Sequence, residues 1–164
     1  MGRMDKATSG QHPDFAAMNG WDGDYPRYDD RDRPVYVGSA TFGKRPLVEG
    51  AEALRERAPD AAIVGAPFDD AVTHRGGARF GPRAVRSGTY QVGAQSLQLG
   101  IDAWDHLDVV DAGDADVVPA WLERGHAMIF EKVLQVAASG AVPIVIGGDH
   151  SITWPSASAV AQAH

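Results

Sequence analysis

The fold of this chain is decided by the stretch VPIVIGGDHS, residues 142–151, in which an apolar run ends at two glycines and three polar residues. A short continuous apolar run is typical of a strand that is buried on both faces. Pro143 stands near the start of the run, where a missing N–H is tolerated. The sequence therefore predicts a buried strand over residues 142–146 that carries Asp149, His150 and Ser151 at its carboxyl end.

Other segments extend this strand into an alternating pattern. The run AAIVGA at residues 61–66 predicts a second strand, and LDVVDA at residues 107–112 predicts a weaker third one. Apolar residues at steps of three and four predict a helix over about 120–139, and further helices are expected to start near Pro82 and after Ser151, a plausible N-cap. Strands that alternate with helices predict an α/β fold with a parallel sheet.

The composition excludes several classes of protein. The chain has 164 residues, of which 44% are hydrophobic, a net charge of −7 and no cysteine. An acidic chain is a poor non-specific binder of nucleic acid, and no apolar run approaches the roughly 20 residues of a membrane-spanning helix. The N-terminus lacks the apolar core of a secretory signal. We therefore expect a soluble, cytoplasmic protein without nucleic-acid or membrane partners.

Residues 1–33 are expected to form an N-terminal arm. They are rich in charges and turn-forming residues, as in DDRDRP at residues 29–34, and show no sustained helical or strand period. Apolar patterning follows, so we assign residues 34–164 to one domain.

The residues after the strand at 142–146 form the first candidate site. His150 would lie at the mouth of the sheet, where an imidazole can bind Mn²⁺, Zn²⁺ or Fe²⁺. Asp149 could be a second ligand, or it could orient the histidine. Alternatively, the segment is only a helix start, with Ser151 as its cap and His150 on the surface. One histidine does not make a metal site.

The glycine-rich segment after the strand at 61–66 is the second candidate site. Asp69, Asp70, His74 and Arg75 could contact a ligand there. Alternatively, the glycines serve only the turn, and the arginines at positions 79 and 83 pair with acidic groups across a subunit boundary; the chemistry alone favours this structural interpretation.

Other conspicuous residues are interpreted as structural. His126 lies on the apolar face of the predicted helix at 120–139 and is expected to be a packed or interface histidine. Trp104, Trp121 and Trp154 are expected to fill the core and its contacts. The glycine motifs of dinucleotide-binding and P-loop proteins, and the motifs of zincins and α/β-hydrolases, do not occur.

Taken together, the ordered motifs resemble the ureohydrolase family, which includes arginase, agmatinase and guanidinobutyrase, and they are most similar to the agmatinase branch. The matching stretches are YVGSATF (36–42), GAPFDDAVTHRGGARFGPRAVR (65–86), VVDAGDADVVP (109–119), HAMI (126–129) and VPIVIGGDHSIT (142–153).

The resemblance implies a three-layer α/β/α domain with a central parallel sheet, assembled as trimers or hexamers. It also implies the hydrolysis of a guanidino compound, such as agmatine, to urea and an amine by two Mn²⁺ ions that share a hydroxide, as in polyamine metabolism. His150 would ligate one manganese and Asp149 would support that ligand. Asp70 and His74 would be candidates for substrate contact, and no catalytic residue is assigned.

Two family motifs that carry the other metal ligands, D-A-H-x-D and D-x-D-x-x-D-P, do not occur. The aspartates at 111–116 align with a structural stretch and do not replace them. The resemblance therefore implies an N-terminal portion of the domain, incomplete at its C-terminus, with the other ligands beyond His164 and no activity alone.

Two questions stay open at this point. The Arg75-Gly76-Gly77 sequence stands where agmatinase relatives often have Arg-Pro-Gly, so agmatine, guanidinobutyrate and guanidinopropionate all remain candidate substrates. The alternative function is that of a non-catalytic half-domain that associates with full-length ureohydrolase subunits through the arm and residues 79–83.

Overall fold

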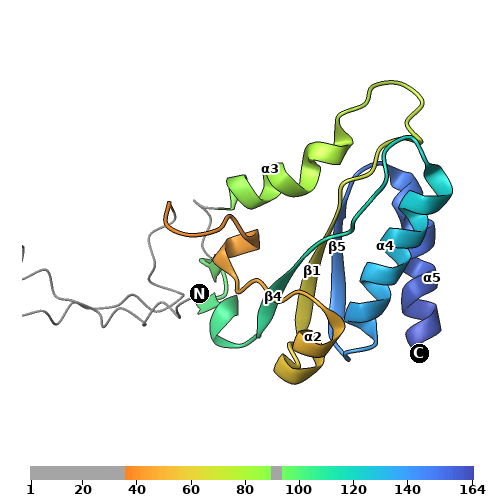
Figure 1. Cartoon of the computed structure of the whole chain (residues 1–164). Coiled ribbons are helices and arrows are strands. Elements are labelled where there is room, and N and C mark those ends of the chain that lie inside the picture. Colours follow the sequence, from red (N-terminus) through yellow and green to blue (C-terminus); the bar gives the residue numbers. More distant parts are fainter. Residues whose placement is uncertain (1–35, 90–93) are drawn as a thin grey trace, which may run out of the picture. The chain divides into compact units, whose positions relative to one another are not determined.

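A computed structural model of the chain describes residues 36–89 and 94–164. The arm expected at residues 1–33 lies outside the described residues. Figure 1 shows how the described elements are arranged. In chain order they are the 3-10 turn η1 (Phe42–Lys44), α2 (Ala51–Arg57), β1 (Ala61–Ala66), η2 (Ala78–Phe80), α3 (Gly81–Gly88), β2 (Gln95–Ser96), β3 (Ile101–Asp102), η3 (Ala103–Asp105), β4 (Val109–Asp114), α4 (Leu122–Ala137), β5 (Val142–Gly147), η4 (His150–Ile152) and α5 (Thr153–Ala163).

The central sheet contains three parallel strands in the order β4-β1-β5. In the middle strand, Ile63 pairs with Asp111 on one side and with Ile144 on the other. Parallel strands need long crossover connections, and α4 lies in the one that leads from β4 past β1 to β5. The predicted strands at 61–66 and 142–146 are confirmed, and so is the parallel α/β fold. The strands β2 and β3 form a separate antiparallel pair.

Helices cover both faces of this sheet. In Figure 1, α4 and α5 lie together on one face and α3 lies on the other. Side chains of a strand alternate between the faces, and the buried core forms on the side of α4. Its members include Ala62, Val64, Val110, Ile129, Val133 and Val136. The three-layer α/β/α arrangement that the resemblance implied is confirmed.

The third strand lies two residues later than the predicted range of 107–112. Leu107 is 49% exposed and precedes the strand. At the other end, Arg86 on α3 donates to Asp111 from Nε and Nη2, at 2.8 and 2.9 Å, and to Asp114 from Nη1 at 2.7 Å. A buried carboxylate is tolerated when it is paired in this way, so the strand holds the fully buried Asp111 and extends to Asp114, two residues beyond the predicted end.

The start of the last helix also differs from the prediction. The sequence favoured Ser151 as the N-cap, but the side chain of Asp149 occupies that role and accepts a hydrogen bond from Ser151 N at 2.8 Å. The turn η4 then precedes α5. The prediction for Ser151 is therefore wrong, because a stronger acceptor two residues earlier reaches the first N–H groups of the turn.

Two of the three tryptophans do not fill the core. Trp121 and Trp154 are 58% and 77% exposed, which contradicts a place in the core for both. Trp104 is half-buried, and the guanidinium of Arg45 lies 4.7 Å from its ring centroid. Both exposed tryptophans stand next to or within the first turn of a helix, where a residue has fewer neighbours than along the helix.

The helices of the described part are short, and α4 is the longest of them. No helix among the described residues has both the length and the apolar character needed to cross a bilayer.

Candidate functional site

The candidate residues lie in loops that leave one edge of the sheet. Parallel strands end at the same edge, and residues 67–77 follow β1, residues 115–121 follow β4 and residues 148–152 follow β5. In open α/β sheets, ligands bind beyond the carboxyl ends of the strands. The two segments singled out in the sequence are therefore brought to the same edge.

The turn after β5 passes close to the turn after β1. Gly148 N donates to Ala66 O at 3.3 Å, and Asp149 N donates to Phe68 O at 2.8 Å. A Cβ atom on Gly148 would lie 1.8 Å from Phe68 O, so a larger residue would force the two backbones apart. Gly148 thus permits the backbone of the turn after β5 to approach the backbone at Phe68.

The carboxylate of Asp149 ties the two turns together. Its Oδ1 accepts from Ser151 N at 2.8 Å, and its Oδ2 accepts from Ala71 N at 2.9 Å. Burial acts to raise the pKa of Asp149, but the hydrogen bonds from Ser151 and Ala71 outweigh it and hold this pKa below its ordinary value. The structure thus gives Asp149 the role of joining the loop at 67–77 to the turn that carries His150.

His150 occupies the first position of η4 and is exposed at the sheet edge. Its Nδ1 lies 3.3 Å from Thr153 Oγ1. Both oxygens of Asp149 are engaged by backbone N–H groups, so in this arrangement the threonine hydroxyl is the group that contacts the imidazole. The ring is accessible to solvent, as a metal ligand or a surface residue would be.

Asp69 and Asp70 form a cluster with Arg79 within the glycine-rich segment. The fully buried carboxylate of Asp69 accepts from Gly77 N and Arg79 Nε. Asp70 accepts from Arg79 Nη2 at 2.6 Å and from Ala120 N, also at 2.6 Å. The hydrogen bond from Gly77, together with those from Arg79, holds the pKa of Asp69 below its ordinary value.

This cluster changes the interpretation of two predicted residues. Arg79 pairs with carboxylates of its own chain, so its charge needs no partner across a subunit boundary. Asp70 fastens its loop to the segment that leads into α4, and a substrate would have to displace one of these bonds to reach it.

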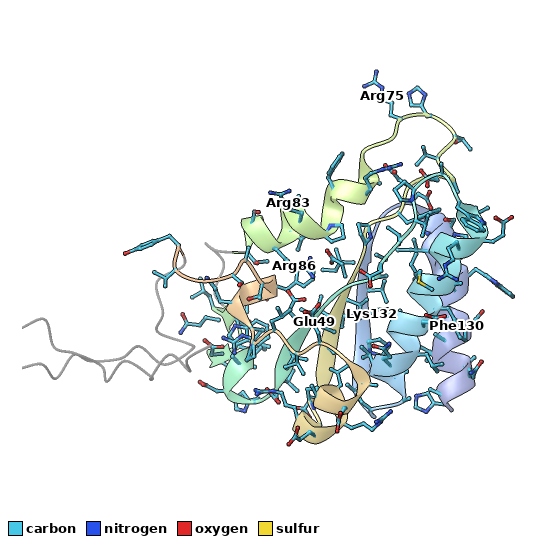
Figure 2. All side chains as sticks on the ribbon, viewed as in Figure 1. Glu49, Arg75, Arg83, Arg86, Phe130 and Lys132 are labelled. Carbon is cyan, nitrogen blue, oxygen red and sulfur yellow. The ribbon has the colours of Figure 1, made fainter. Side chains whose placement is uncertain are left out.

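His74 and Arg75 lie in the exposed part of the same loop. Figure 2 shows Arg75 at the far end of this loop, directed away from the sheet, whereas Arg86 lies between α3 and the sheet. The loop therefore offers His74 and Arg75 to solvent at the same edge as His150, and the structure brings neither of them into contact with His150.

His126 has a more specific role than the sequence predicted. It is partly buried, as expected, and its ring meets Phe68 edge to face with the centroids 5.3 Å apart. In addition, its Nε2 lies 2.9 Å from Ser151 Oγ. The helical spacing predicted a packed histidine, but no local pattern could reveal this bond to a residue of a different element.

The described residues do not fit a site for two metal ions. Such a site needs several imidazole and carboxylate ligands. Within residues 36–89 and 94–164, no group of three or more His, Asp or Glu side chains is placed to hold a metal. Asp69, Asp70 and Asp149 all accept hydrogen bonds from the protein itself. Among the described residues, His150 therefore remains a single candidate ligand.

Comparison with known proteins supports the family resemblance that the sequence motifs indicated. Residues 59–164 match the model of the arginase family. The chain is 39% identical over 78% of its length to a mitochondrial agmatinase of Gallus gallus and 36% identical over 80% to a mitochondrial guanidino acid hydrolase of Mus musculus. A solved structure of proclavaminate amidino hydrolase from Streptomyces clavuligerus superposes on 80% of the chain with a TM-score of 0.70 and 30% identity.

The match covers only part of each relative. The chain spans 36% of the agmatinase and of the guanidino acid hydrolase, and 42% of the amidino hydrolase. The family model nevertheless extends from just before β1 to the end of α5 and includes every loop of the candidate site. The chain belongs to the arginase family.

Proposed function

We propose that the protein to which this chain contributes is a manganese-dependent hydrolase that converts a guanidino compound to urea and an amine, with agmatine as the first candidate substrate. The observation that carries the proposal is the turn after β5, in which His150 is exposed beyond the carboxyl end of a strand in an arginase-family sheet. Relatives named for the hydrolysis of agmatine and of guanidino acids support this reaction class.

Each candidate residue has a defined part in this proposal. His150 would be one metal ligand, and Asp149 would hold the turn that presents it. A metal-bound hydroxide, which two such ions supply, is a strong nucleophile at neutral pH. The described residues contain no group of side chains that could hold a metal ion together. The remaining ligands and the catalytic residues would therefore lie outside them.

The substrate is a finer question. His74 is exposed at the edge that carries His150 and is the better placed of the two candidates for substrate contact, because the oxygens of Asp70 already bind Arg79 and Ala120. The relatives differ in whether the substrate named for them is agmatine or a guanidino acid. Agmatine carries a cationic group at the end opposite its guanidino group, whereas a guanidino acid carries an anionic group there.

The test is urea release by the protein as its organism makes it, with Mn²⁺ added and with agmatine, 4-guanidinobutyrate and 3-guanidinopropionate compared. We expect urea from one of these substrates and none from the 164-residue chain alone. Urea from the 164-residue chain would refute the inactivity expected of it. A failure of the native protein to release urea from any of the three would refute the proposed reaction.

A second candidate function is a non-catalytic half-domain that associates with full-length ureohydrolase subunits. The observation that favours it is β5, which pairs on one side only among the described strands. Sedimentation of the purified chain, alone and with a full-length relative, separates the two functions, because a stable mixed species is expected only for the half-domain. Assembly into trimers or hexamers and a cytoplasmic location remain predictions.

A further inference from the structure

The helix α4 is joined to the turn after β5 by a hydrogen bond between two side chains. His126 lies one turn into α4, which begins at Leu122. Its Nε2 lies 2.9 Å from the Oγ atom of Ser151, the residue that directly follows His150. The bond therefore links the helix that precedes β5 to the turn that carries the candidate ligand.

The first turn of α4 is seated closely on the turn after β1, and this contact sets the position of His126. Gly125 is buried, and a Cβ atom on it would lie 2.5 Å from Cε2 of Phe68. Because glycine lacks this atom, the ring of Phe68 can lie against the helix. The imidazole of His126 meets the same ring edge to face. The helix therefore holds His126 within reach of Ser151.

Ser151 is held from two directions. Its N–H donates to Asp149 Oδ1 at 2.8 Å, and its hydroxyl contacts the imidazole of His126. Both His126 and Ser151 are partly buried. A polar group that loses its partner in such a place is costly, because water replaces the lost bond only incompletely. The bond to His126 thus restricts η4 from the side of α4, while Asp149 restricts it from the side of the turn after β1.

The imidazole of His150 has little support of its own. It is exposed, and its Nδ1 lies 3.3 Å from Thr153 Oγ1. The neighbours of His150 on both sides are fixed, since Asp149 is bonded to the loop after β1 and Ser151 is bonded to His126. The direction in which the His150 side chain leaves the sheet edge therefore depends on the backbone of η4.

We propose that His126 is a positioning residue, whose hydrogen bond to Ser151 fixes η4 and thereby the direction of His150. The proposal rests on the proposed function for the part that it gives to His150, and it adds a residue that acts through the turn rather than on the substrate. Packing alone does not account for His126, because a phenylalanine would fill the same place against Phe68 without a nitrogen atom that faces Ser151.

The experiment compares variants of the native protein that separate the hydrogen bond from the packing. His126→Phe keeps a ring against Phe68 and loses the bond, whereas Ser151→Ala removes the partner of His126. His126→Gln carries an amide nitrogen about as far along its side chain as the imidazole Nε2 and should restore the bond. The control is Phe130→Leu, one turn further along α4 (Figure 2), because it removes apolar packing from the same helix.

Hydrogen exchange at the amide of position 151 is measured relative to the amide of Val64, which lies in β1 and is fully buried. We expect His126→Phe and Ser151→Ala each to raise this ratio by about three- to tenfold, the effect of one hydrogen bond. The two substitutions together should do no more than either alone, because both remove the same bond. The rate of urea release at saturating Mn²⁺ and substrate should fall by about tenfold in each. His126→Gln and Phe130→Leu should retain the wild-type ratio and rate.

An unchanged exchange ratio in His126→Phe, or strictly additive effects of the two substitutions, would overturn the proposal and leave His126 as a packing residue. A raised ratio with an unchanged rate of urea release would also overturn it, because His126 would then hold the turn without any consequence for His150. If the native protein released no urea at all, the proposed reaction would fail, whereas the exchange measurements would still decide whether His126 fixes η4.

Discussion

At the scale of single residues, Arg86 joins α3 to the sheet through charges rather than through apolar contact. Its guanidinium pairs with Asp111 and Asp114 and lies 4.1 Å from the centroid of the Phe42 ring. Asp111 is fully buried and also accepts from Phe42 N and Gly113 N. Burial acts to lower the pKa of Arg86, but the hydrogen bonds to Asp111 and Asp114 outweigh it and hold this pKa above its ordinary value.

The first prediction follows from this pairing. Replacement Arg86→Met leaves Asp111 buried without its cation, and we expect a loss of about 3–5 kcal/mol in the free energy of unfolding, measured with urea. The matched control is Arg83→Met, because Arg83 is exposed on the same helix (Figure 2). Equal losses in both variants would show that the buried pairing does not stabilise the fold.

Asp149 gives a prediction for pH. Its pKa lies below the ordinary value of 3.8 in the folded protein, so its bonds to Ala71 and Ser151 stabilise the fold above that pH and are lost as the pH falls through the lower folded value. We expect Asp149→Asn to reduce the loss of stability that follows as the pH falls below about 5, measured by urea unfolding. The exposed control Asp116→Asn should behave like the wild type, and an unchanged profile for Asp149→Asn would contradict the assignment.

At the scale of elements, the turns after β1 and β5 are built against each other. Gly148 allows the backbones to meet, and Asp149 fastens the loop at 67–77. The strands themselves were predictable, since β1 and β5 are continuous apolar runs. The hydrogen bond from Ala71 to Asp149 was not predictable, because the two residues are separated by 78 positions and no local pattern links them.

A matched pair of alanine substitutions tests this contact. In Gly148→Ala the new Cβ would meet Phe68 O, and we expect a loss of stability of about 1–3 kcal/mol or more. Gly88 lies in α3 with no atom within 4 Å of the position of a Cβ, so Gly88→Ala should leave stability unchanged or raise it by up to about 1 kcal/mol. The stability of both variants is measured by thermal unfolding. A Gly148→Ala variant as stable as the wild type would refute the close approach of the two backbones.

At the scale of the whole molecule, the loops of the candidate site gather at the edge of the sheet at which open α/β folds bind ligands. Sequence motifs predicted its family, its sheet and the position of His150. They did not predict that Asp149 caps η4 or that His126 contacts Ser151, because both depend on how separate elements meet.

The most direct test of the central claim is urea release by the native protein with Mn²⁺, compared between the wild type, His150→Ala and the control His106→Ala. His106 is exposed in a different part of the fold. We predict that His150→Ala lowers the rate by more than about 100-fold, since even groups that only support a metal ligand contribute about 10–100-fold, and that His106→Ala retains the wild-type rate. A His150→Ala variant as active as the wild type would contradict the account.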